Sequence, residues 1–144
     1  MHDTVSRKNS LPVLIIGAGI SGLLLAQQLR QLKVPFQIFE RDSDFSTRGL
    51  GWGLTLHWSL SALRECLPED LLSRLPDTYV DRAAVERGEC STFPFFDLTT
   101  GELKFSSPRA GENERIRVTR ERLRRLLATD IDIQVCSKLP NTDT

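Results

Sequence analysis

The sequence predicts an α/β fold that starts with a strand, a helix and a second strand parallel to the first. Three observations predict it: a wholly apolar run at residues 12–16, a cluster of glycines at 17–22, and a second, mostly apolar run at 36–39. A short, β-branched apolar run is typical of a strand buried on both faces of a parallel sheet. Parallel strands need a long crossover, and a helix fits between these two runs.

The crossover helix is expected from Ile20 to about Lys33, where leucines and alanine recur near helical spacing. Pro35 ends that helix, because proline cannot continue one. The second strand then leads directly into Glu40, Arg41 and Asp42.

Further along, residues 53–57 are expected to be extended, and two short helices are expected at 59–66 and 69–75. Residues 93–98 and 102–105 are expected to be two strands joined at Thr99-Thr100-Gly101, which predicts a small β-hairpin insertion.

The C-terminal part is expected to hold one more helix and one more strand. Thr119 is a candidate N-cap for the helix, which should run to about Ala128. The alternating residues 131–135 predict the last strand. We expect residues 11–137 to form part of one domain, between a flexible tail at 1–10 and a second tail at 138–144.

The composition excludes several classes of protein. The chain has 144 residues and a formal net charge of zero from 19 basic and 19 acidic residues. No general attraction to nucleic acid or to anionic membranes is expected. Glycines and polar residues interrupt the apolar stretch 11–29, so we expect neither a signal peptide nor a membrane span, and a cytoplasmic location. Cys66, Cys90 and Cys136 are far apart and odd in number, which predicts unpaired thiols and no metal site.

The strongest motif is Gly17-Ala18-Gly19-Ile20-Ser21-Gly22 together with Glu40, 18 residues further on. A strand, this glycine spacing, a helix start and a distant acid form the signature of dinucleotide binding. Gly17 would make the turn, Gly19 would admit a pyrophosphate, and Gly22 would let the helix approach the strand. The carboxylate of Glu40 would accept hydrogen bonds from the ribose, which makes NADP unfavourable at this site but leaves FAD and NAD open.

Four segments, two of which contain the glycine motif and Glu40, resemble the sequences of one family. They are Ile16-Gly-Ala-Gly-Ile-Ser-Gly-Leu23, Phe39-Glu-Arg-Asp42, Arg48-Gly-Leu-Gly-Trp-Gly-Leu-Thr-Leu56 and Arg117-Val-Thr-Arg-Glu-Arg-Leu-Arg-Arg-Leu-Leu127. With them the chain resembles the FAD-dependent aromatic-type monooxygenases, flavoprotein hydroxylases similar to p-hydroxybenzoate and salicylate hydroxylase, and especially their fungal members.

The resemblance implies a Rossmann-like, glutathione-reductase-type FAD-binding unit. It also implies an oxidoreductase that uses FAD and NAD(P)H to hydroxylate or epoxidise an organic small molecule. The cofactor-binding positions it implies are Gly17, Ala18, Gly19, Ile20, Ser21, Gly22, Glu40, Arg41, Arg48, Gly53 and Arg120. No catalytic side chain is assigned.

Other conspicuous side chains are expected to have ordinary roles. Trp52 and Trp58 are expected to pack in the core, and nothing in the sequence pairs with His57 to make it catalytic. Residues 115–125 contain six arginines, most of which are expected to lie on a solvated helix face, with one or two contacting phosphate.

The family's later Gly-Asp motif, which returns to the flavin, does not occur in this sequence. We therefore expect a truncated form that holds the ADP-binding half of the site. In this fold the first strand lies beside the strand that carries the Gly-Asp motif, so the 12–16 strand would become an open sheet edge, prone to self-association. The alternatives are a non-catalytic nucleotide-binding fragment and an NAD-binding dehydrogenase module.

Overall fold

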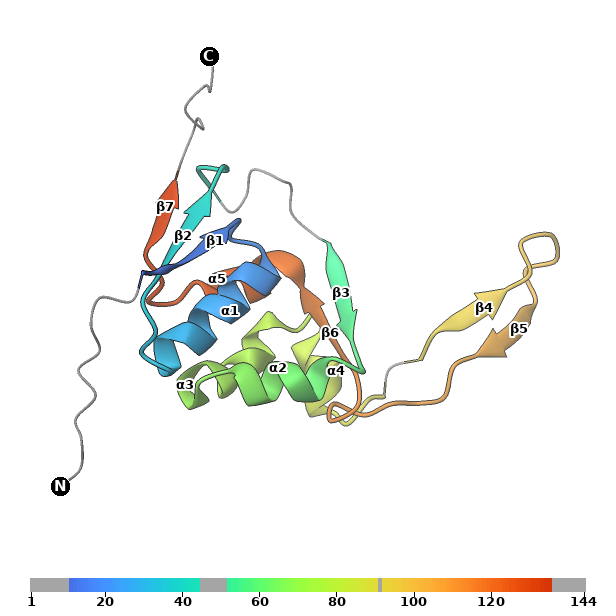
Figure 1. Ribbon diagram of the computed structural model, residues 1–144. Coiled ribbons are helices and arrows are strands. Elements are labelled where there is room, and N and C mark those ends of the chain that lie inside the picture. Colours follow the sequence, from blue (N-terminus) through green and yellow to red (C-terminus); the bar gives the residue numbers. More distant parts are fainter. Residues whose placement is uncertain (1–10, 45–51, 91, 136–144) are drawn as a thin grey trace, which may run out of the picture.

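A parallel three-stranded sheet forms one end of the molecule in the computed structural model (Figure 1). Its strands are β1 (Val13–Ile16), β2 (Phe36–Glu40) and β7 (Ile133–Val135), in the order β1-β2-β7. The register pairs Ile15 with Ile38, and Ile38 with Ile133, so one face carries an apolar stripe across all three strands. The structure describes residues 11–44, 52–90 and 92–135.

Two helices from distant parts of the chain lie next to this sheet. Helix α1 (Ile20–Gln31) packs on β1 and β2, and α5 (Arg120–Leu127) packs against α1. The two helices are joined by Gln27, whose side chain is fully buried. Its amide nitrogen donates hydrogen bonds to the carbonyl oxygens of Leu127 and Thr129, both at 2.8 Å, and so satisfies carbonyl groups at the end of α5.

A layer of short helices lies below α1 and α5 in Figure 1. It consists of α2 (Leu60–Cys66), α3 (Glu69–Leu72), the 3₁₀ helix η1 (Leu75–Thr78) and α4 (Arg82–Glu86). One hydrophobic core joins the sheet, the two long helices and this layer. Its fully buried members are Leu23, Ala26, Ile38, Leu71, Val118, Leu123 and Leu127.

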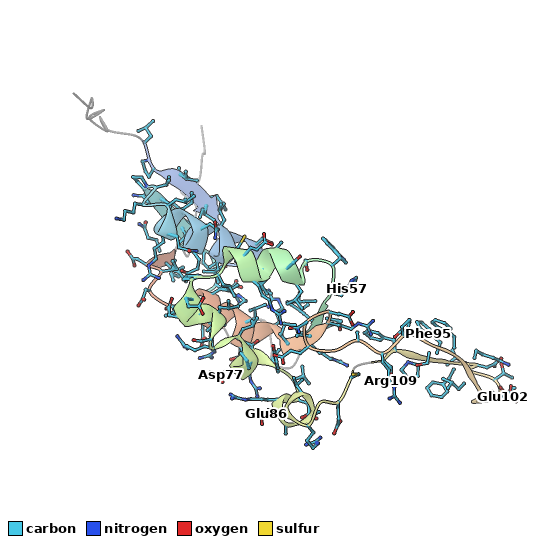
Figure 2. The ribbon with its side chains drawn as sticks, turned by 90° about the horizontal axis from the view of Figure 1, so that it is seen from below. His57, Asp77, Glu86, Phe95, Glu102 and Arg109 are labelled. Atoms are coloured by element: carbon cyan, nitrogen blue, oxygen red, sulfur yellow. The ribbon has the colours of Figure 1, made fainter. Side chains whose placement is uncertain are left out.

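Two antiparallel pairs complete the described fold. Strand β3 (Gly53–Leu56) pairs with β6 (Ile116–Thr119), which leads directly into α5. Strands β4 (Pro94–Phe96) and β5 (Leu103–Ser106) form the predicted hairpin. Figure 1 shows this hairpin as an arm that projects from the body, and Figure 2 shows Phe95 and Glu102 on it. The predicted α/β class, with a parallel sheet and a hairpin insertion, is confirmed.

The expectation that β1 is buried on both faces is wrong for the described residues. Only Ile15 is buried, whereas Leu14 and Ile16 are 60% and 82% exposed. The physical reason is that α1 covers one face of the sheet, and no described element covers the other. β1 is also an edge strand, as expected, because it pairs with β2 alone.

Two smaller expectations are corrected, and one strand was not expected. Trp52 and Trp58 are 72% and 82% exposed, so neither packs in the core. Thr119 is the N-cap of α5, but its side chain makes no capping hydrogen bond. Strand β6 was not predicted, because its alternating Ile116 and Val118 form only a four-residue run before the arginine-rich helix.

Two further expectations concern the cysteines and a possible membrane span. Cys66 and Cys90 are free thiols, while Cys136 lies outside the described residues. Among the described helices, none is both long enough and apolar enough to span a membrane.

Replacing Gln27 with leucine should lower the free energy of unfolding by about 2 kcal/mol, because two carbonyl groups at the end of α5 would lose their donor. Urea unfolding followed by circular dichroism measures the change. Gln31→Leu is the control, since Gln31 is exposed and its acceptor, the Cys66 carbonyl, is also bonded by Gln28. Equal effects of the two substitutions would contradict this role of Gln27.

Candidate dinucleotide-binding site

Two glycines are required by the fold of the chain itself: Gly17 in the turn between β1 and α1, and Gly22 in the first turn of α1. Gly17 has φ +101°, a conformation that side chains with a Cβ rarely adopt. A Cβ on Gly22 would overlap the carbonyl oxygen of Gly17, so α1 could not lie this close to the turn. These two positions explain the sharp turn and the tight packing of helix on strand.

Gly19 differs from both, because nothing lies within 4 Å of the place where its Cβ would be. It is the N-cap of α1, with φ −76° and ψ 178°, which other residues adopt readily. The described fold therefore does not need glycine at position 19. The absence of a side chain at Gly19 leaves open space beside the backbone.

That space lies at the N-terminus of α1. The first intrahelical hydrogen bond runs from the Leu23 N–H to the Gly19 carbonyl, so the N–H groups of Ile20, Ser21 and Gly22 precede it. The first turn holds no acidic residue and no side-chain cap. A helix start of this kind favours an anionic group.

Glu40 ends β2 and reaches back to the glycine turn. Its Oε2 accepts a hydrogen bond from the Ala18 N–H at 2.8 Å. Its Oε1 accepts hydrogen bonds from the N–H groups of Arg41 and Asp42, at 2.8 and 3.0 Å. Burial alone would raise the pKa of Glu40, but these three hydrogen bonds hold the pKa below its ordinary value. Glu40 is therefore an ionised acceptor at neutral pH.

Arg124, from the second turn of α5, holds the other side of Ala18. Its Nε and Nη2 donate to the Ala18 carbonyl oxygen at 3.0 and 2.9 Å. Its Nη2 also lies 3.7 Å from Oε2 of Glu40. The residue is only 3% exposed, and a buried guanidinium requires such partners. Ala18 is thus bonded to a carboxylate through its N–H and to a guanidinium through its C=O.

A cavity of about 210 Å³ opens beside this group. Sites that enclose a whole small ligand usually measure about 300–1,000 Å³, so this one has room for part of a dinucleotide. The residues that line it are Ala18, Glu40, Asp42, Ser43, Asp44, Arg124, Ile133 and Val135.

The structure brings together some of the other predicted positions. Arg120 begins α5, and its backbone N–H donates to the carbonyl of Trp52, next to Gly53, at 2.8 Å. Arg120 precedes Arg124 by four residues, so the two lie on the same side of α5, about 6 Å apart along its axis. Arg41 follows Glu40, but its side chain is 78% exposed.

Arg48, another predicted position, lies outside the described residues. His57 is exposed and makes an edge-on ring contact with the exposed Trp58.

The fold and the site define a Rossmann-like, dinucleotide-binding class of protein. A family model described as an NAD(P)-binding Rossmann-like domain matches residues 15–64, which contain the end of β1, the glycine turn, α1 and Glu40. Its description names NAD(P), whose ADP moiety FAD shares.

Relatives with more specific names cover more of the chain. The chain is 58% identical over 122 residues to a protein of Arthroderma benhamiae named "Probable FAD-dependent monooxygenase". It is 43% identical over 125 residues to the FAD-dependent monooxygenase dbaB of Emericella nidulans. These matches cover 85% and 86% of this chain, and 28% and 30% of the relatives.

A solved structure agrees in fold. The 2,6-dihydroxypyridine-3-hydroxylase of Arthrobacter nicotinovorans matches with a TM-score of 0.59 and 20% identity, over 90% of this chain and 29% of the other. The chain belongs to the family of FAD-dependent monooxygenases, and it spans less than a third of the length of these relatives.

Sequence reasoning missed Arg124 as a site residue. Most of the six arginines at 115–125 are expected on a solvated helix face, and Arg122 and Arg125, the neighbours of Arg124, are indeed exposed. The available signal was its position between Leu123 and Leu127, both of which are buried on the inner side of α5.

The two glycines Gly19 and Gly22 should respond differently to alanine. Gly22→Ala should lower the free energy of unfolding by about 1–3 kcal/mol, because its methyl group would overlap backbone. Gly19→Ala should change it by no more than about 0.5 kcal/mol, since the space is open, and should instead weaken the binding of ADP. Urea unfolding and titration calorimetry of both variants test this, and a Gly19→Ala variant with unchanged ADP affinity would contradict it.

Proposed function

We propose that this chain binds the ADP half of FAD and so contributes the cofactor-binding start of an NAD(P)H-dependent monooxygenase. The substrate would be an organic small molecule that is hydroxylated or epoxidised. One observation carries the proposal: the ionised carboxylate of Glu40 is fixed beside both the glycine turn and the cavity. Bound FAD would supply the oxygen chemistry, and the residues of this chain would hold it in place.

The described residues fit the parts of ADP in order. Oε1 of Glu40 already accepts two backbone N–H groups, while Oε2 accepts one and keeps capacity for a ribose hydroxyl. The side chains of Ile133 and Val135 offer an apolar wall to the adenine. The N–H groups at the start of α1 would receive the pyrophosphate in the open space at Gly19.

The remaining predicted positions would serve the flavin side of the cofactor. Gly53 and Arg120 lie close together where β3, β6 and α5 join. Arg120 lies about one helical turn before Arg124, towards the start of α5. We propose that Arg120 extends from there towards the cofactor, and that Arg48 and Gly53 lie over it. Arg41 would contribute at the edge of the site through its backbone, which already positions Glu40.

The reductant and the substrate belong to the proposal for the whole protein, because the chain spans only 28% of the Arthroderma benhamiae relative. The relatives' names favour FAD over an NAD-binding dehydrogenase module. The free thiols of Cys66 and Cys90 agree with a reducing, cytoplasmic location.

We also infer that this chain associates with itself through β1. The Val13 N–H donates to the Pro35 carbonyl just before β2, and the Gly17 N–H donates to the Phe39 carbonyl in β2. The backbone groups of the alternate residues Leu14 and Ile16 therefore face the open edge. Their backbone groups have no strand to pair with among the described residues, and their side chains are exposed and apolar. An open apolar edge of this kind is a template for a second strand.

A Glu40→Gln substitution tests cofactor binding. We expect the purified chain to bind FAD more tightly than NAD. Glu40→Gln should weaken FAD binding by about 1–3 kcal/mol, because a charged acceptor for the ribose is lost. Titration calorimetry measures both, and Glu65→Gln, an exposed acid on α2, is the control. A chain that prefers NAD, or equal FAD affinities of the wild type and Glu40→Gln, would overturn the proposal.

A charge on β1 tests self-association. Light scattering during gel filtration should show wild-type species that grow with concentration, and Leu14→Lys should shift them towards the monomer. Leu25→Lys, at an exposed leucine of α1, should leave them unchanged. A wild-type chain that stays monomeric at all concentrations would refute pairing through β1.

A further inference from the structure

We propose that Arg124 is a positioning residue that sets the direction in which the Gly19 N–H meets the pyrophosphate. This rests on the proposed function, and it assigns a specific task to a side chain outside the glycine motif. Arg124 lies 106 residues after Ala18 in the chain, on a different helix from the turn it contacts.

The argument starts from the peptide bond between Ala18 and Gly19. Two donors of one guanidinium converge on the Ala18 carbonyl oxygen, at 3.0 and 2.9 Å. In a trans peptide the C=O and the following N–H point in opposite directions. No cis peptide bond occurs among the described residues, so the Gly19 N–H points away from Arg124.

That N–H group is available to a ligand. Among the described residues it has no hydrogen-bond acceptor, and the space beside Gly19 is open. The preceding N–H, that of Ala18, is already bonded to Glu40 and faces the protein. The two N–H groups therefore have different tasks. The Ala18 N–H holds the carboxylate of Glu40, while Arg124 orients the next peptide so that the Gly19 N–H points outward.

The chemistry of the side chain matters as well as its charge. A guanidinium can give two hydrogen bonds in a fixed planar geometry, whereas a lysine ammonium acts as a point charge. Two bonds to one carbonyl restrain the rotation of the peptide plane more than a single bond does. The nearby carboxylate of Glu40, 3.7 Å away, balances the buried charge.

The test compares Arg124→Lys with the wild type for ADP and for adenosine, which lacks the phosphates. Calorimetry should show ADP affinity roughly tenfold lower in Arg124→Lys, the effect of one lost charge-assisted hydrogen bond, and adenosine affinity nearly unchanged. The matched control is Arg125→Lys, the exposed neighbour that pairs with Glu121, which should leave both affinities unchanged.

A spectroscopic readout separates positioning from stability. With ¹⁵N-labelled glycine, the Gly19 amide resonance of the wild type should move on addition of ADP, and it should move less in Arg124→Lys. Urea unfolding gives the folded fraction of each variant. Arg124→Gln, which keeps one donor without the charge, serves as the second variant if the lysine variant folds poorly.

Equal losses of ADP and adenosine affinity in the folded variants would overturn the proposal, as would an unchanged Gly19 resonance shift. A wild-type chain that binds ADP but prefers NAD to FAD would contradict the proposed function while leaving this comparison valid. A wild-type chain that binds none of these nucleotides would overturn both.

Discussion

The Ala18 peptide is the point on which the rest of the site depends. Its N–H is bonded to Glu40 at the end of β2, and its C=O is bonded to Arg124 on α5. The end of β2 and helix α5, which are far apart in the sequence, are therefore both bonded to this one residue of the turn. Because both partners are charged and little exposed, replacing either would leave the other in a site that has excluded most water. This is a strong reason for the turn to keep one conformation before any ligand arrives.

The packing of α5 against α1 places Arg124 within reach of the turn. That packing depends on one glycine and one glutamine as well as on leucines. Gly22 lets α1 approach the turn, and Gln27 bonds the end of α5 from the middle of α1. The opposite face of the sheet is different, since Leu14 and Ile16 remain exposed there. The protein thus has a well-packed interior on the side of the candidate site and an open strand on the other.

Much of the fold could be predicted because its signals are local. The apolar runs of β1 and β2, the helical spacing of α1 and the hairpin turn at residues 99–101 each lie within a short window. Strand β6 escaped prediction because its four residues run directly into an arginine-rich helix, and its pairing with β3 is set 60 residues away. Trp52 and Trp58 were misplaced because large apolar side chains are usually buried, and only the position of β3 at the margin of the fold exposes them.

The sequence by itself determined the turn. Glycine is needed at positions 17 and 22 by local geometry, and the spacing to Glu40 follows from the length of one helix and one strand. It also placed the chain in its family, because those motifs are contiguous. Only the tertiary structure decided which of six arginines is buried, that Ala18 is bonded from both sides, and that the cavity has Ile133 and Val135 as a wall. Those features join residues about 20 to 106 positions apart, and no local pattern records which distant side chains will meet.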